Sequence, residues 1–249
     1  MKTHSKFHPL FVGYHPKYTE QSLTFLLIMT IVGGYMNGYS YVTRGGSLVS
    51  MQSGNMARIG IAAYTQDLNL FIISVIPVVG CLIGCTLAYI GRDGKKESTP
   101  IYWQRLALIA EIILFIVVGF IPTGFHNHWV NLTIAVVAGF QLCSLKSYRG
   151  YAHTTTLASG NVRNLGHILA DLILKRDLET LQLFIEYTIL FVSFTGGAFL
   201  GVVVSVSIGA QAIWVCCFLL FVLLLQMYSP RAYEEERRYR ETHYHLEET

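Results

Sequence analysis

Residues 33–60 read GGYMNGYSYVTRGGSLVSMQSGNMARIG: an apolar, glycine-rich stretch, a short polar segment, and then Ser53-Gly54-Asn55. The apolar stretch reaches back to Leu23, so it has about the 20 residues that a helix needs to cross a bilayer. Ser, Gly and Asn favour helix ends and breaks over helix interiors. This part of the sequence therefore predicts a membrane-spanning helix, a break, and a second, shorter helix.

The composition of the whole chain agrees with a polytopic membrane protein. Of its 249 residues, 53% are hydrophobic and 13% are charged, with a mean hydropathy of +0.46. Soluble domains carry about 25% charged residues. The composition excludes a disordered chain, a fibrous repeat and an ordinary cytosolic enzyme. The net charge of +3 is not a nucleic-acid signal, and the five cysteines lie in apolar stretches, where we expect packing residues and no disulfides.

Six stretches are long and apolar enough to cross the membrane, and we predict an all-α protein with six transmembrane helices. The predicted spans are Leu23–Val42, Leu68–Ile90, Tyr102–Ile121, Trp129–Leu145, Leu181–Ser205 and Ala210–Tyr228.

The distribution of Lys and Arg predicts the orientation, because cytoplasmic loops of membrane proteins are enriched in these residues. With the N-terminus in the cytoplasm, 16 of the 18 Lys and Arg residues fall on the cytoplasmic side, and Arg44 and Arg58 fall on the other. Both termini are then cytoplasmic, as an N-terminal tail over 1–20 and a charged tail over 231–249.

An internal repeat is visible in the sequence. MQSGNMARIGIAA (51–63) pairs with LASGNVRNLGHIL (157–169), 106 residues later. Each copy follows one predicted span and precedes two more, so each repeat holds three spans. Since three is odd, the second repeat has to enter the membrane from the opposite side. We therefore predict two inverted-topology repeats over 21–122 and 123–230, an arrangement common in transporters and channels. A duplication that serves packing without transport is the alternative.

The segments GGYMNGYSYV and GGSLVSMQSGNMARIG resemble the hallmark region of the YoaK-type bacterial membrane proteins. The resemblance covers residues 21–228 and implies a six-span protein of the bacterial cytoplasmic membrane. The family's function is uncharacterised, so the resemblance implies little chemistry. Ser53 stands where the family often has Thr, and the second half is more divergent, with Lys146, Tyr148 and Arg149 in the region that matches Ser40–Thr43.

The two SGN segments, residues 53–55 and 159–161, are the first candidate site. We expect Asn55 and Asn161 to cap short helices, whose free N–H groups and dipoles favour anions. Either the segments form a paired polar site on a solute path, or they are two helix caps at the membrane surface. The candidate path residues are Ser53, Gly54, Asn55, Arg58, Ser159, Gly160, Asn161, Arg163 and Glu111.

Glu111 is included because it lies near the centre of the third predicted span. A carboxylate at that depth usually faces the bundle interior and is paired or protonated. It serves either proton coupling or cation binding, or it is a neutral, hydrogen-bonded structural acid. We expect Glu186, one turn into the fifth span, to lie at the membrane interface.

Three GxxxG pairs favour close helix packing, either inside the monomer, which is the preferred interpretation, or at a homodimer seam. They are Gly34/Gly38, Gly80/Gly84 and Gly197/Gly201.

The sequence carries no catalytic motif that we recognise, so we expect no enzyme, no cofactor and no metal site. It predicts a small-solute transporter or channel with its path between the two repeats, and with the lipid bilayer and a small solute as partners. The alternative is a non-transporting membrane scaffold or sensor.

Overall fold

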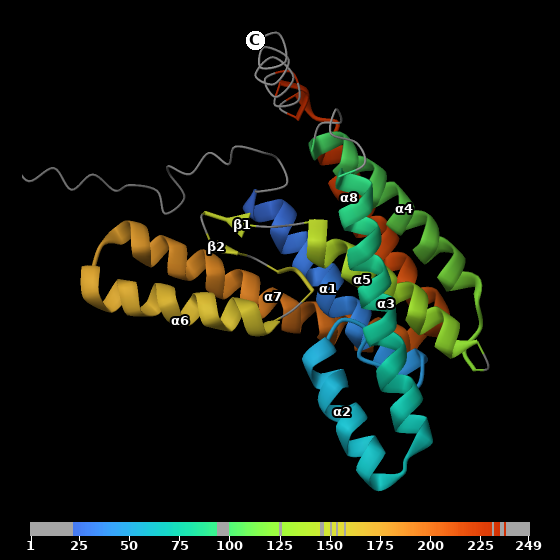
Figure 1. The fold of residues 1–249 in the computed structure, drawn as a ribbon. Coiled ribbons are helices and arrows are strands. Elements are labelled where there is room, and N and C mark those ends of the chain that lie inside the picture. The colour runs from blue at the N-terminus through green and yellow to red at the C-terminus, as the bar shows by residue number, and fades with distance from the viewer. Residues whose placement is uncertain are drawn as a thin grey trace, which may run out of the picture.

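The computed structural model describes residues 22–93, 100–124, 126–144, 147–149, 151–152, 154–156, 158–230, 232–234 and 237. The predicted N-terminal tail and most of the predicted C-terminal tail lie outside these residues. The described chain is helical apart from one two-stranded hairpin, which confirms the predicted all-α class (Figure 1).

The helices and strands follow one another from α1 to α8. Their order is α1 (Leu23–Thr43), α2 (Gln52–Thr65), α3 (Leu68–Asp93), α4 (Pro100–Phe120), α5 (Asn127–Ser144), β1 (Ser147–Tyr148), β2 (Tyr151–Ala152), α6 (Ala158–Lys175), α7 (Leu178–Ile208), the 3-10 helix η2 (Gly209–Ile213) and α8 (Trp214–Gln226). The six predicted spans fall on α1, α3, α4, α5, α7 and α8, and the two predicted short helices are α2 and α6.

Four stretches of the described chain are long and apolar enough to cross a membrane. They are Leu23–Thr43, Leu68–Gly91, Trp103–Phe120 and Leu178–Gln226. The last has 49 residues and joins α7, η2 and α8; Gly209, with φ of +64°, ends α7 within it. These apolar helices indicate a membrane-embedded protein.

Two helix pairs form the centre of the bundle, α1 with α7 and α3 with α5. Their glycines allow the backbones to approach closely. A Cβ at Gly34 would collide with the carbonyl oxygen of Phe194 on α7, and a Cβ at Gly84 would collide with that of Val136 on α5. Apolar helices gain little from the hydrophobic effect in lipid, so backbone contact of this kind is what holds them together.

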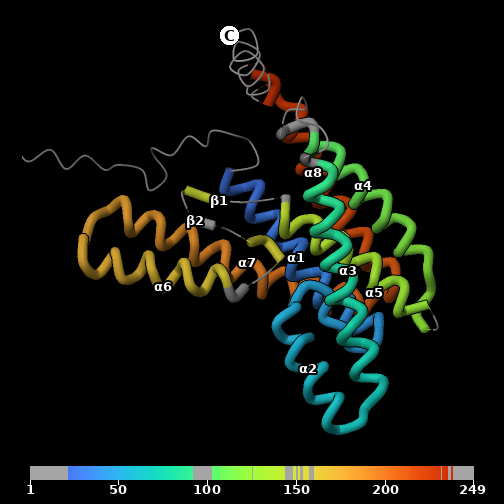
Figure 2. Tube along the Cα trace, in the orientation of Figure 1, coloured from blue at the N-terminus to red at the C-terminus, as the bar shows by residue number. Residues whose placement is uncertain are grey.

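Two helical hairpins extend from this bundle in different directions (Figure 1). In one, α2 runs beside the first part of α3, and in the other, α6 runs beside the first part of α7. α2 and α6 each carry one SGN segment. The chain that leads into each of them passes through the middle of the molecule, as the trace in Figure 2 shows.

Candidate functional site

The segment between α1 and α2 folds back against the middle of α1. The backbone N–H of Ser50 donates to Asn37 Oδ1 (3.2 Å), and Asn37 Nδ2 donates to Ser50 Oγ (2.7 Å) and to the carbonyl oxygen of Gly33 (2.9 Å). Gly33 is the central residue of the 21-residue α1. The non-helical chain therefore reaches back to Asn37, about one helical turn from the centre of a helix that is long enough to span a bilayer.

The segment before α6 reaches the same point. Ser50 Oγ donates to the carbonyl oxygen of Thr156 at 2.7 Å, and Ser50, Thr155 and Thr156 are all buried. A Cβ at Gly33 would collide with the carbonyl oxygen of Thr155, so the missing side chain makes room for this segment. Two non-helical segments thus meet beside the centre of α1.

The meeting residues have equivalent places relative to the two SGN segments. Ser50 and Thr156 are 106 residues apart, which is the offset of the two SGN segments. Each lies three residues before the serine of its SGN segment. Two residues with the same place before an SGN segment therefore contact each other.

The SGN segments lie inside the first turns of α2 and α6, because α2 begins at Gln52 and α6 at Ala158. Asn55 Nδ2 donates to the carbonyl oxygen of Leu48, and Asn161 Nδ2 donates to that of Thr154, each seven residues back and each at 2.8 Å. We expected these asparagines to cap the helix N–H groups. Instead, both bind the preceding non-helical segment and hold it against the first helical turn.

The first turns of α2 and α6 leave space and polar atoms near the meeting point. A Cβ at Gly54 would meet no atom within 4 Å, and one at Gly160 would lie 3.4 Å from Thr154 Oγ1. Asn55 Oδ1 and Thr155 Oγ1 are buried without a hydrogen-bond partner among the described residues. Buried polar atoms are almost always paired, so these two atoms are free to bind a solute or water.

The other candidates of the SGN region are more peripheral. Ser53 and Arg163 are exposed, and Arg58 Nη1 donates to the carbonyl oxygen of Gly46 at 3.2 Å. The backbone of Ser159 lies in the first turn of α6, and its side chain lies outside the described part. Arg58 thus stabilises the first break, while Arg163 makes no hydrogen bond or ion pair within the described chain.

Glu111 is buried in the middle of α4, and its Oε2 accepts a hydrogen bond from Gln141 Nε2 on α5 at 2.6 Å. Its partner is therefore Gln141 and neither of the SGN segments.

The glycines of the predicted GxxxG pairs line the two central helix contacts. Gly34 and Gly38 face α7, Gly80 and Gly84 face α5, and Gly197 and Gly201 face α1.

Arg44, at the end of α1, is fully buried. Its Nη2 donates to Tyr39 Oη (2.7 Å) and to the carbonyl oxygen of Ile121 (2.8 Å), and its Nη1 donates to that of Pro122 (2.9 Å). These carbonyl groups close the C-terminal end of α4, where a positive charge is favoured by the helix dipole. Arg44 therefore holds the start of the non-helical segment between α1 and α2 against the C-terminal end of α4.

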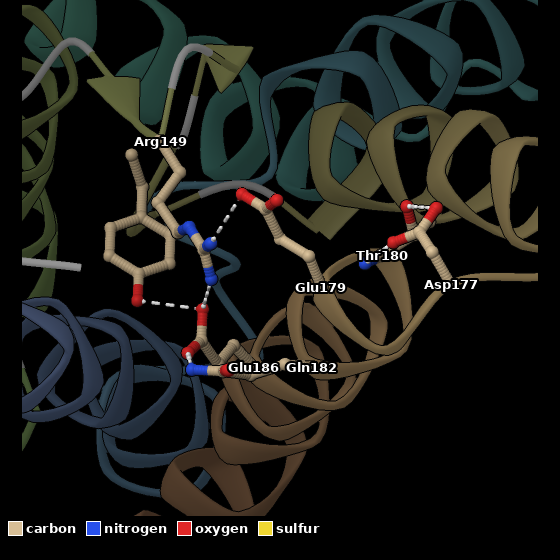
Figure 3. A network of polar contacts seen from close by, with 7 residues as sticks. Arg149, Asp177, Glu179, Thr180, Gln182 and Glu186 are labelled. Carbon is tan, nitrogen blue, oxygen red and sulfur yellow. Dashed lines mark hydrogen bonds and ion pairs between the residues drawn. The ribbon is translucent and has the colours of Figure 1, made fainter. Parts of the chain in front are cut away.

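A second arginine network, around the buried Glu186, joins the hairpin β1–β2 to α7 (Figure 3). Arg149 Nη1 pairs with Glu186 Oε2 at 2.8 Å, and Tyr148 Oη donates to the same oxygen at 3.0 Å. Gln182 Nε2 donates to Glu186 Oε1 at 2.9 Å. Glu186 is thus a buried, ion-paired residue.

At the start of α7, the backbone N–H of Thr180 donates to Asp177 Oδ1 at 2.7 Å and lowers the pKa of Asp177 (Figure 3). This bond caps the first turn of α7.

Three residues of the meeting point, Asn37, Ser50 and Thr156, were not among the candidate residues predicted from the sequence. Asn37 and Thr156 were recognisable as polar residues beside the two non-helical segments, but their hydrogen bonds to Ser50 were not predictable. The signal that could have found Ser50 and Thr156 is their shared register, three residues before each SGN segment.

Comparison with protein families gives one decisive match. The family model described as "Protein of unknown function (DUF1275)" matches residues 25–226. The chain belongs to this family. It is the family of the YoaK-type proteins, so the resemblance seen in the sequence is confirmed. Comparison with curated proteins gave no match, and neither did comparison with solved structures.

Proposed function

We propose that this DUF1275 protein is a small-solute transporter or channel whose path lies between two inverted repeats. In this proposal α1, α3 and α4 are the spans of the first repeat, and α5, α7 and α8 are those of the second. The membrane is the bacterial cytoplasmic membrane, with both termini in the cytoplasm, as the distribution of Lys and Arg predicts.

The observation that carries the proposal is the contact between Ser50 and Thr156 beside the centre of α1. Non-helical backbone at membrane depth is tolerated only where it is buried in protein or lines a watery cavity. Transporters place their solute sites at such breaks, near the bilayer midplane and between their repeats. Two breaks that meet at the middle of a span are the arrangement that a solute path needs.

The helix contacts support the inverted repeat. α1 packs on α7, and the equivalent helices of the other half, α5 and α3, pack on each other. α2 packs on α3 as α6 packs on α7. Asn55 and Asn161 make the same bond to the residue seven positions back. A twofold axis between Ser50 and Thr156 accounts for all of these pairs.

A small anion is the solute that this geometry favours. α2 and α6 both begin next to the meeting point, and a helix N-terminus carries about half a positive elementary charge together with free N–H groups. Two such ends attract an anion to the centre of the protein and repel cations. The Thr155 hydroxyl, which has no hydrogen-bond partner among the described residues, can donate a further bond to the anion.

Anion flux into proteoliposomes tests the proposal. Vesicles containing the purified protein are mixed with potassium nitrate or with glycerol, with valinomycin present so that K⁺ can accompany the anion, and swelling is followed by light scattering. We expect nitrate entry above that of empty vesicles. Gly54→Leu fills the open space at the start of α2 and should reduce the nitrate rate by about tenfold, which corresponds to about 1.4 kcal/mol of barrier.

Gly60→Leu is the matched control, because a Cβ at Gly60 also meets no atom within 4 Å but lies on α2 beyond the SGN segment. It should transport nitrate like the original protein. Equal rates for the two variants, or no nitrate entry with correctly folded protein, would reject the proposed path.

A further inference from the structure

The described part of the chain buries two carboxylates, Glu111 and Glu186, in very different surroundings. Glu186 is bound by the Arg149 guanidinium, the Tyr148 hydroxyl and the Gln182 amide. Glu111 accepts a single hydrogen bond, from Gln141 Nε2, and none of the ion pairs among the described residues includes it. A charged carboxylate in such a place is strongly disfavoured unless it is paired.

The side chain of Gln141 also has an unsatisfied hydrogen-bonding atom. Its Oε1 atom is buried and has no hydrogen-bond donor among the described residues. A carboxylic acid and a primary amide can satisfy each other through two bonds, one from the amide N–H to the acid and one from the acid O–H to the amide oxygen. A proton on Glu111 therefore neutralises the buried charge and also supplies the donor that Gln141 Oε1 lacks.

We infer that Glu111 and Gln141 form a proton-binding site, and that its proton drives movement of the solute. The second part rests on the proposed function. Binding of the proton forms one O–H bond on the Glu111 carboxylate and breaks no bond in the protein. Its release returns the carboxylate, which then has one amide N–H as partner.

The groups around Glu111 are compatible with proton binding by its carboxyl group. α4 packs against α5, α8 and η2. From α5 comes Gln141. α8 carries two thiols: Cys216, which is fully buried, and Cys217, whose Sγ donates to the carbonyl oxygen of Ile112 on α4 at 3.7 Å. The nearest arginines act at the ends of α4: Arg105 donates to the carbonyl oxygen of Met227, and Arg44 donates to that of Val118. Positions 105 and 118 lie about 9 and 10 Å along the helix from Glu111.

Infrared spectroscopy tests the proton-binding site without any transport. The purified protein should show the C=O stretching band of a protonated carboxyl group at neutral pH, with a shift in deuterated buffer. Glu111→Gln should remove this band. Glu186→Gln is the matched control, because it removes the other buried carboxylate, and it should leave the band in place. A band that survives Glu111→Gln, or no band in the original protein, would overturn the site.

Transport driven by a pH gradient tests the coupling. Proteoliposomes are given a pH gradient in the presence of nitrate, and nitrate accumulation is compared with downhill nitrate exchange. In Glu111→Gln, accumulation should be lost and exchange should persist, whereas Glu111→Asp should retain accumulation. Accumulation by Glu111→Gln, or loss of both processes in a folded variant, would overturn the coupling. Absence of all nitrate flux in the original protein would refute the proposed function, while the infrared band would still decide on the proton site.

Discussion

Two adjacent glycines of α7 allow a sharp test of how the bundle is held together. A Cβ at Gly197 would collide with the backbone carbonyl of Ile31 on α1, whereas a Cβ at Gly196 would meet no atom within 4 Å. Both positions gain about 1 kcal/mol of helix propensity on replacement by Ala. Overpacking costs about 1–3 kcal/mol, and the upper end applies at Gly197 because the obstacle is backbone.

Gly196→Ala should therefore raise the free energy of unfolding by up to about 1 kcal/mol, and Gly197→Ala should lower it by about 2 kcal/mol. The measurement is unfolding in mixed micelles with increasing SDS, followed by circular dichroism. The reasoning is refuted if Gly197→Ala is as stable as Gly196→Ala. If Gly197→Ala changes only the oligomeric state, the glycine pairs serve a homodimer seam and not the α1–α7 contact.

Two further predictions concern the first break. Asn37→Ala removes both hydrogen bonds to Ser50 and leaves buried groups unpaired, so it should lower the unfolding free energy by about 2–3 kcal/mol. Thr133→Ala removes only an exposed hydrogen bond to the carbonyl oxygen of Trp129 and should not have this effect; an equal loss in both variants would contradict the role of Asn37. Arg44→Met leaves the carbonyl groups at the end of α4 without their donors and should cost about 3 kcal/mol in the same assay. Arg44→Lys should not restore the full stability, because one ammonium group cannot replace the forked guanidinium.

The helices were predictable because a bilayer imposes a simple requirement on sequence. Apolar stretches of about 20 residues with charges between them predict spans. The predicted stretches fall on helices, and four stretches of the described chain are long and apolar enough to cross a membrane. The shorter α2 and α6 were also visible, since Ser, Gly and Asn disfavour helix interiors and apolar residues follow them.

The sequence did not predict how far the two non-helical segments reach into the helix bundle. Residues 44–51 are polar and glycine-rich, as in a surface loop. They fold back to the centre of α1 because Asn37 pairs with the backbone and hydroxyl groups of Ser50. The ion pair between Arg149 and Glu186 was missed for the same reason. Such contacts depend on how helices that are distant in sequence lie against each other, and local sequence patterns do not contain this information.

The central claim is that a solute path lies between two inverted repeats, and it follows that the two SGN segments should open toward this path from opposite sides of the membrane. Thiol labelling tests it most directly, with Ser53→Cys or Ser159→Cys placed in a chain whose five native cysteines are replaced by Ala. Intact vesicles are treated with a membrane-impermeant maleimide from one side at a time. The account predicts that the two positions react from opposite sides. Protection of both positions from both sides would contradict it and would favour a scaffold in which the breaks serve packing alone.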